Sequence, residues 1–134
     1  MADTKSISAA GTASSDAITL QTDTVYAAIY TKLDVTGTPA SGDNIQFRVL
    51  HGGGDPDGSG SDEYETSGNS PTRLLLNGFT EDPAIGQPIP LDPTAKNLKL
   101  HATSLAASNA IVVSGRLIEI GADGLKTSTL LAWT

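Results

Sequence analysis

Apolar and polar residues alternate most clearly between Asn97 and Ile120. Leu98, Leu100 and Ala102 are separated by polar residues, which is the period of two expected of a half-buried strand. After a short break at residues 106–108, the β-branched residues that follow favour a second strand. The two segments together predict a hairpin.

The second of these strands does not keep its apolar residues on one face. Ile111 and Val113 share a face, whereas Ile118 and Ile120 fall on the opposite one. A one-residue bulge near Gly115 would turn all four toward the core. The alternative is a strand buried on both faces, by the opposite sheet and by a neighbouring subunit.

Five further segments carry strand patterns between turn residues. They are residues 17–20, 25–33, 45–50, 73–76 and 125–134. A helix competes over residues 25–33, because Tyr26 and Tyr30 are four apart. We favour a strand there, since β-branched and aromatic residues dominate and no helix cap precedes them. Residues 80–93 hold four prolines, which excludes a central strand and favours a crossing between sheets or a cover for a sheet edge.

The whole pattern predicts one all-β domain. About eight short strands between Gly- and Pro-rich turns are typical of an antiparallel β-sandwich, and we favour a jelly-roll-like form. The sandwich would occupy residues 16–134. Residues 1–15, rich in Ala, Ser and Thr, predict an arm that is ordered only where something holds it, with a frayed terminus as the alternative. Trp133 predicts that the last strand is docked, on its own sheet or on a neighbouring subunit.

The charge balance of the chain limits its partners. Eight Lys and Arg residues against 15 Asp and Glu residues give a net charge of −7, and the basic residues are scattered singly along the sequence. Nucleic acids and anionic membranes are bound through basic clusters, so we expect neither as a partner. The chain has no Cys, which excludes disulfides and thiolate metal sites. Residues 1–10 lack the apolar region of a signal peptide, and no apolar run is long enough to span a membrane.

The acidic segment from Asp55 to Glu65 is the first candidate for a metal site. Oxygen ligands at its first, third and fifth positions, with Gly60 at the sixth, resemble the start of a calcium loop. The twelfth position, where an EF-hand needs Glu, is Thr66. A solvated loop whose carboxylates repel one another is therefore favoured over a calcium site.

The remaining candidates for catalysis lack the partners that their chemistry requires. Residues His51 to Gly54 spell HGGG, an oxyanion-loop string that has meaning only beside a G-x-S-x-G elbow, and the chain has no such elbow. His101 falls on the polar face of its predicted strand, which favours an exposed or hydrogen-bonded residue. Glu81 and Asp82 lie in a Pro-rich loop with no sign of a cleft. We expect no catalytic, cofactor-binding or metal-binding residues and no enzymatic activity.

The three tyrosines are the residues that a sugar-binding surface could use. Tyr26 and Tyr30 share one face of their predicted strand, and Tyr64 lies at the far end of the acidic segment. A shallow aromatic patch would favour carbohydrate binding. Packing of Tyr26 and Tyr30 against a neighbouring strand or subunit explains them equally well.

The layout of the chain resembles that of the head decoration (cement) proteins of tailed bacteriophages. The resemblance is carried by the N-terminal segment, by ASSDAITLQTDTVYAAIYTKL followed by SGDNIQFRVL, by the Gly/Asp loop with its Pro-rich crossing, and by the closing LKLHATSLAASNAIVVSGRLIEIG. It covers most of the chain and includes no diagnostic motif.

The resemblance implies a virion structural protein. Such a subunit would be a homotrimeric β-sandwich, assembled in the host cytoplasm, that binds the major capsid protein lattice at the capsid surface and stabilises the head. No catalytic residues would carry over. The N-terminal arm would attach by strand addition. The alternatives are a carbohydrate- or receptor-binding phage adhesin and another phage component, such as a tail or connector protein.

Overall fold

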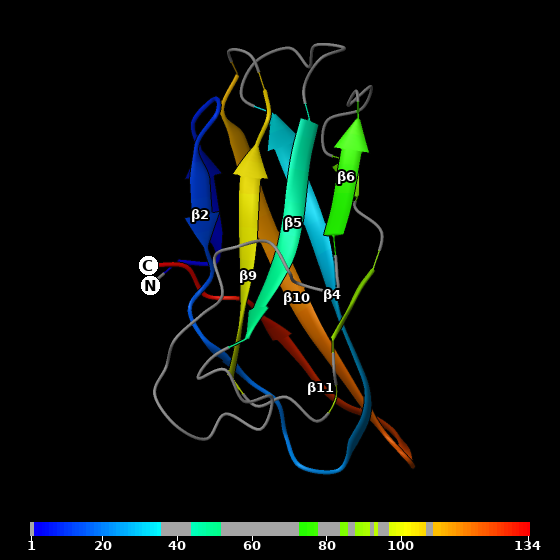
Figure 1. The fold of residues 1–134 in the computed structure, drawn as a ribbon. Coiled ribbons are helices and arrows are strands. Elements are labelled where there is room, and N and C mark those ends of the chain that lie inside the picture. Colours follow the sequence, from blue (N-terminus) through cyan, green and yellow to red (C-terminus); the bar gives the residue numbers. More distant parts are fainter. Residues whose placement is uncertain are drawn as a thin grey trace.

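The computed structural model describes residues 2–35, 44–51, 73–77, 84–85, 88–91, 93, 97–106 and 109–134. These residues contain strands and turns but no helix, and the strands form two antiparallel sheets packed face to face (Figure 1). The all-β, antiparallel sandwich predicted from the sequence is therefore confirmed. The strands are β1 (Thr4–Ile7), β2 (Thr12–Ser14), β3 (Ile18–Thr19), β4 (Thr24–Val35), β5 (Asn44–His51), β6 (Arg73–Asn77), β7 (Ala84–Ile85), β8 (Ile89–Leu91), β9 (Asn97–Ser104), β10 (Ile111–Gly121) and β11 (Gly124–Leu130).

We call the two layers the β4–β10 sheet and the β5–β9 sheet, after their central strands. The β4–β10 sheet has the order β1-β10-β4-β7, with β11 also paired to β10 and β8 to β4. The β5–β9 sheet has the order β2-β9-β5-β6, with β3 also paired to β9. Along the described strands, the chain passes repeatedly between the two sheets. In the Pro-rich region, β7 and β8 are short edge strands beside β4, so the exclusion of a central strand there is confirmed.

The core lies between the sheets and is built mainly from aliphatic residues. Alternate positions of the central strands are fully buried, among them Ile29, Phe47, Leu100 and Val113, each 0% exposed. Trp133 is 1% exposed and joins the same core. Its backbone exchanges two hydrogen bonds with Ala2, of 2.8 and 2.9 Å, which ties the two ends of the chain together (Figure 1). The docking of Trp133 on its own domain is thus confirmed.

The N-terminal segment is part of both sheets. Thr4–Ile7 pairs with β10, and Thr12–Ser14 pairs with β9. Ile7 is 2% exposed, so the segment also contributes to the core. The sequence favoured an arm over residues 1–15 because its side chains carry little apolar surface. What holds the segment in the structure is the backbone hydrogen bonding offered by the edges of β9 and β10.

The alternation of β10 differs from the prediction. Burial alternates without interruption from Ile111 to Gly121, so a bulge near Gly115 is wrong. The register of β10 shifts only beside Ile120, and the extra residue lies in β4 and in β11 rather than in β10. As a result Leu117 and Glu119 face the core, 5% and 2% exposed. The isoleucines that follow them, at positions 118 and 120, lie half-buried on the outer face.

Gly115 has a packing role in this strand. A Cβ atom built there would lie 2.7 Å from Leu131 Cδ1 and 3.3 Å from Ile29 Cγ2. The backbone N–H of Leu131 donates to the carbonyl oxygen of Gly115 at 2.8 Å, which holds the chain after β11 close to β10. The glycine therefore makes room for the side chain of Leu131, and this packing explains a glycine at position 115 without a bulge.

Candidate functional site

Most of the acidic and catalytic candidates from the sequence lie outside the described residues. This holds for the segment from Asp55 to Glu65, for Tyr64, for the glycines after His51, and for Glu81 and Asp82. Within the described part of the chain, no group of three or more His, Cys, Asp or Glu side chains could hold a metal ion. None of the segments described there is a helix long and apolar enough to cross a membrane.

His101 is held within the surface of the β5–β9 sheet. Its Nδ1 lies 2.8 Å from the hydroxyl oxygen of Ser14 on β2. Burial, and then the nearby positive charge of Arg48, lower the pKa of His101 below its ordinary value of 6.5. His101 is therefore neutral at pH 7, and the prediction of a hydrogen-bonded strand histidine is confirmed.

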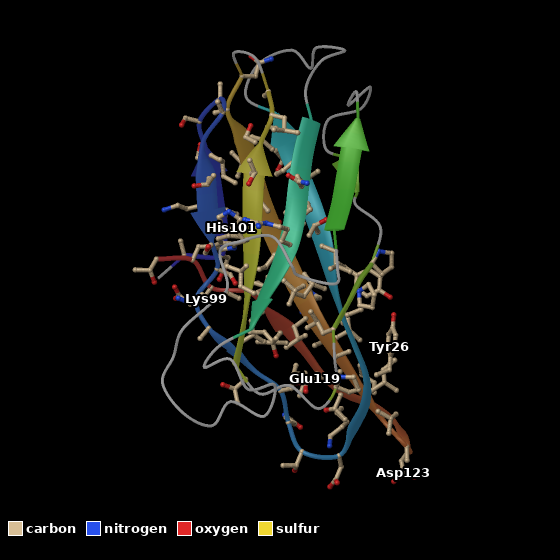
Figure 2. The ribbon with its side chains drawn as sticks, viewed as in Figure 1. Tyr26, Lys99, His101, Glu119 and Asp123 are labelled. Carbon is tan, nitrogen blue, oxygen red and sulfur yellow. The ribbon has the colours of Figure 1, made fainter. Side chains whose placement is uncertain are left out.

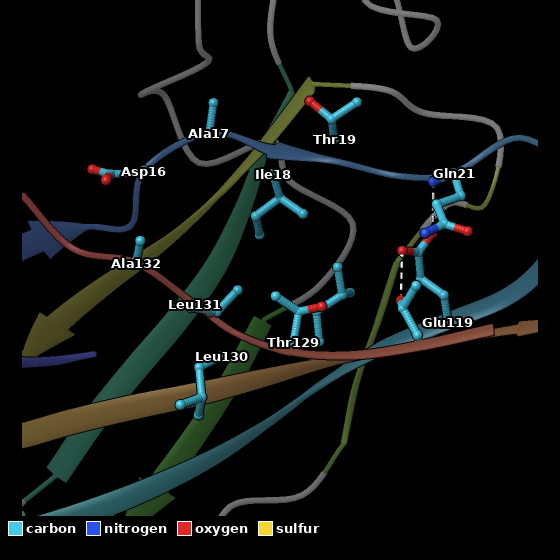
Figure 3. A pocket seen from close by; sticks show the side chains of 12 residues that line it. Asp16, Ala17, Ile18, Thr19, Gln21, Glu119, Thr129, Leu130, Leu131 and Ala132 are labelled. Carbon is cyan, nitrogen blue, oxygen red and sulfur yellow. Dashed lines mark hydrogen bonds between the residues drawn. The ribbon is translucent and has the colours of Figure 1, made fainter. Parts of the chain in front are cut away.

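One cavity lies between the edges of the two sheets (Figure 3). It has a volume of about 260 Å³. Residues 16–21 form one wall, and β10, β11 and the residues after β11 form the other. The cavity contains one buried carboxylate, Glu119, at 2% exposure.

Glu119 is fully engaged by hydrogen-bond donors. Its Oε1 accepts from the backbone N–H of Gln21 at 2.7 Å and from the Thr24 hydroxyl at 2.9 Å. Its Oε2 accepts from the Thr127 hydroxyl at 2.9 Å. These contacts tie the turn before β4 to β11. Asp16, the other acid at this cavity, lies at its far end and accepts from the Thr134 hydroxyl at 2.5 Å (Figure 3). The cavity therefore presents a structural carboxylate and no acid–base pair.

The outer face of the β4–β10 sheet is apolar at its centre. We define the tyrosine face by the residues that alternate outward there: Tyr26, Ala28, Tyr30, Ile118, Ile120 and Leu130. Tyr26 and Tyr30 are each 43% exposed and Leu130 is 44% exposed, while Ala28 between the tyrosines is completely covered. A shallow hollow of about 250 Å³ lies between Tyr30 and Leu130. The prediction that both tyrosines share one strand face is confirmed.

Polar side chains surround this apolar centre. Lys32 and Asp34, the next outward residues of β4, approach to 3.9 Å. Arg116 on β10 pairs with Tyr30 of β4 on one side and with Leu130 of β11 on the other. Its Nη1 donates to the Ser128 hydroxyl at 2.9 Å. An apolar centre with a polar rim is the usual anatomy of a protein–protein interface. The sequence placed both tyrosines on one strand face. Its bulge model wrongly turned Ile118 and Ile120 toward the core, whereas its alternative of a strand covered on both faces leaves them outward.

Comparisons of the chain with protein-family models, with curated proteins and with solved structures gave no match. The function is therefore argued from the geometry of the chain itself, together with the resemblance in layout described above.

Proposed function

We propose that this protein is a non-enzymatic structural subunit of a phage virion, a decoration protein that binds the major capsid protein lattice and stabilises the head. The observation that carries the proposal is the tyrosine face. Tyr26, Tyr30 and Leu130 are each more than 40% exposed on a sheet whose other side is already packed against the core. Burying such a face yields about 25 cal/mol for each Å² of apolar surface removed from water.

The form of the face fits a broad, flat contact. Residues on both sides of Tyr30 belong to neighbouring strands of one sheet, so the surface has a rigid backbone and needs little ordering when it binds. Tyrosine supplies contact area at low entropic cost. We assign this face to contacts within the virion, between copies of a homotrimer and with the capsid lattice. The protein would act at the capsid surface after assembly in the host cytoplasm.

Attachment by strand addition of the N-terminal segment is a weaker model than the tyrosine face. Thr4–Ile7 and Thr12–Ser14 already pair with β10 and β9. Deleting residues 1–15 would remove two strands from the sandwich, and we expect it to unfold the domain. Point substitutions on the tyrosine face are therefore the appropriate test.

Two leucines provide a matched pair for this test. Leu130 on the tyrosine face is 44% exposed, and Leu105, beyond the end of β9, is 47% exposed. We expect the wild-type protein and Leu105→Ser to pellet with phage capsids and to sediment as trimers. We expect Leu130→Ser to stay in the supernatant and to sediment as a monomer. A wild-type protein that does not pellet with capsids would overturn the proposal, and so would equal loss of binding in both variants.

A sugar-binding adhesin is the second candidate, and the two exposed tyrosines favour it. Tyr26 and Tyr30 are four residues apart on one strand, a separation of about 13 Å at 3.3 Å per residue. One sugar ring cannot stack on both, so an oligosaccharide would have to span them. Binding on a glycan array that is lost in Tyr26→Ser and in Tyr30→Ser would replace the first proposal with this one.

A further inference from the structure

Strand β11 lies at one side of the β4–β10 sheet, where β10 is its neighbour among the described strands. The strand follows a turn at Asp123, at one end of the sandwich (Figure 2). Six of its seven residues are exposed, including Leu125 at 67% and Leu130 at 44%. The side of β11 that faces away from β10 is therefore an open strand edge, which can act as a template for a further strand.

The strand register shows which backbone groups lie on this open edge. The N–H of Leu131 donates to the carbonyl oxygen of Gly115 at 2.8 Å, in the same register that pairs β11 with β10. In an antiparallel pair, residues that bond to the neighbouring strand alternate with residues whose backbone groups point away from it. The N–H and C=O groups of Ser128 and Leu130 therefore point away from β10.

The chain itself uses the next position along this edge. The N–H of Asp16 donates to the carbonyl oxygen of Ala132 at 2.9 Å, and the chain then turns away to form β3 on the other sheet. This contact shows that the edge can bond an extended segment, and it also closes the edge beyond Leu130. The four backbone groups of Ser128 and Leu130 have no partner among the described residues.

The open edge borders the cavity between the two sheets (Figure 3). Thr127 and Thr129 of β11 line this cavity, residues 16–21 form its opposite wall, and Ile18 and Leu131 supply apolar surface. A strand added to β11 would continue the β4–β10 sheet, so every second side chain of that strand would point into the gap between the sheets. The cavity volume of about 260 Å³ gives room for a long side chain there.

The cavity is acidic. Its lining includes Asp16 and Glu119 but no Lys, Arg or His. Among the described residues, the side-chain donors to both carboxylates are threonine hydroxyls and the backbone donor is an N–H, so no cation balances their charge. Lys126 of β11 donates instead to the carbonyl oxygen of Thr22. An inward lysine from an added strand would lay its apolar stem on the aliphatic walls and bring its ammonium group toward the carboxylates, whereas an inward acid would be repelled.

We propose that the open edge of β11 docks an extended segment of another protein, antiparallel to residues 128–130, with a lysine between aliphatic residues facing the cavity. The main-chain hydrogen bonds of such an added strand supply affinity, and the pocket beside the edge supplies specificity. The antiparallel direction follows the pairing of both sheets and is the more stable one per residue. The edge adjoins the tyrosine face at Leu130, but the proposal does not depend on the proposed function.

The test uses the full chain and the end-blocked heptapeptide Thr-Val-Thr-Lys-Thr-Val-Thr, with binding measured by isothermal titration calorimetry. The test variant is Ser128→Pro, which removes one outward N–H and breaks no hydrogen bond to β10. The matched control is Ser128→Ala, which loses the same hydroxyl but keeps the N–H. We expect Ser128→Pro to bind the peptide about tenfold more weakly than the wild type, and Ser128→Ala to bind it like the wild type. Thermal unfolding of both variants verifies that they are folded.

Methylation of the peptide backbone tests the same geometry from the side of the ligand. With the peptide lysine facing inward, methyl groups on the third and fifth nitrogens block the peptide edge that meets β11, and those on the second and sixth block the opposite edge. We expect about tenfold weaker binding for the first methylated peptide and unchanged binding for the second. Because these peptides carry the same charge, a general attraction to an acidic protein cannot produce the difference. Norleucine in place of the peptide lysine should weaken binding about threefold.

Four results would overturn the proposal. The first is no binding of the parent peptide to the wild type, or equal binding by Ser128→Pro and Ser128→Ala. The second is equal loss of binding with both methylated peptides, and the third is a norleucine peptide that binds as tightly as the parent. The fourth is self-association of the wild type that Ser128→Pro alone removes, which would assign the edge to a second copy of this chain. Loss of capsid binding in Leu130→Ser does not bear on any of them, so the two proposals fail separately.

Discussion

Replacing Gly115 with alanine tests the packing between β10 and the segment that follows β11. The added methyl group would meet Leu131 Cδ1 at 2.7 Å and Ile29 Cγ2 at 3.3 Å. Both neighbours are buried, with exposures of 4% and 0%. The hydrogen bond of 2.8 Å between Leu131 and Gly115 keeps the backbone from moving apart to relieve the clash.

The expected cost follows from this geometry. Overpacking a core usually costs about 1–3 kcal/mol. Gly→Ala also restricts the unfolded chain, which returns about 0.4–1 kcal/mol. We expect the free energy of unfolding to fall by about 1–2 kcal/mol in Gly115→Ala, with no change in the denaturant slope. Urea unfolding followed by fluorescence of Trp133 measures it, because Trp133 is the only Trp and is 1% exposed.

Leu131→Ala provides the control for the mechanism. Alone it should cost about 2–5 kcal/mol, because it leaves a cavity in the core. Combined with Gly115→Ala it should cost less than the sum of the two single changes by about 1 kcal/mol, since the new methyl group enters the space that Leu131 vacates. Gly115→Ala as stable as the wild type, or strict additivity in the double variant, would refute the packing of Leu131 over Gly115.

Three further predictions concern single residues. Glu119→Ala should lower the free energy of unfolding by about 3 kcal/mol in urea, because it removes the acceptor of three hydrogen bonds, of which the one from Thr24 is buried. Glu119→Gln should cost less, and equal stability of the wild type and both variants would contradict this. Because the folded state holds the pKa of His101 below its unfolded value of 6.5, the free energy of unfolding of the wild type should fall as the pH drops below about 6.5. His101→Gln should lose less stability over the same pH range. Parallel pH profiles of the two proteins in urea unfolding would exclude the effect. Gly124 has a φ of +119° and nothing near its Cβ position, so Gly124→Ala should lower the free energy of unfolding by about 1–2 kcal/mol through backbone strain alone. The change would appear as a lower thermal midpoint, and an unchanged midpoint would rule it out.

The sequence predicts the elements whose burial follows their local pattern. In β9 the apolar residues Leu98, Leu100 and Ala102 face the core, each at 0% exposure, as their alternation predicts. The strand over residues 25–33 is likewise observed, as β4. In these strands one face is covered by the core, so hydrophobicity and burial coincide.

The prediction fails where burial is decided by partners distant in sequence. Glu119 faces the core because Gln21, Thr24 and Thr127 donate to it, and no hydrophobic pattern contains that information. Ile118 lies on the outer face because the alternation of β10 places it there. We assign the apolar character of that face to binding. The pairing of Arg48 with Arg73 across β5 and β6 depends on the register between strands, which the linear order of residues does not reveal.

Electron microscopy of phage capsids mixed with the purified protein tests the central proposal most directly. The account predicts additional density at regular positions on the outer capsid lattice, with the tyrosine face turned toward the capsid protein or a neighbouring subunit. It also predicts bare capsids when Leu130→Ser replaces the wild-type protein. Bare capsids with the wild-type protein at saturating concentration would contradict the assignment as a decoration subunit.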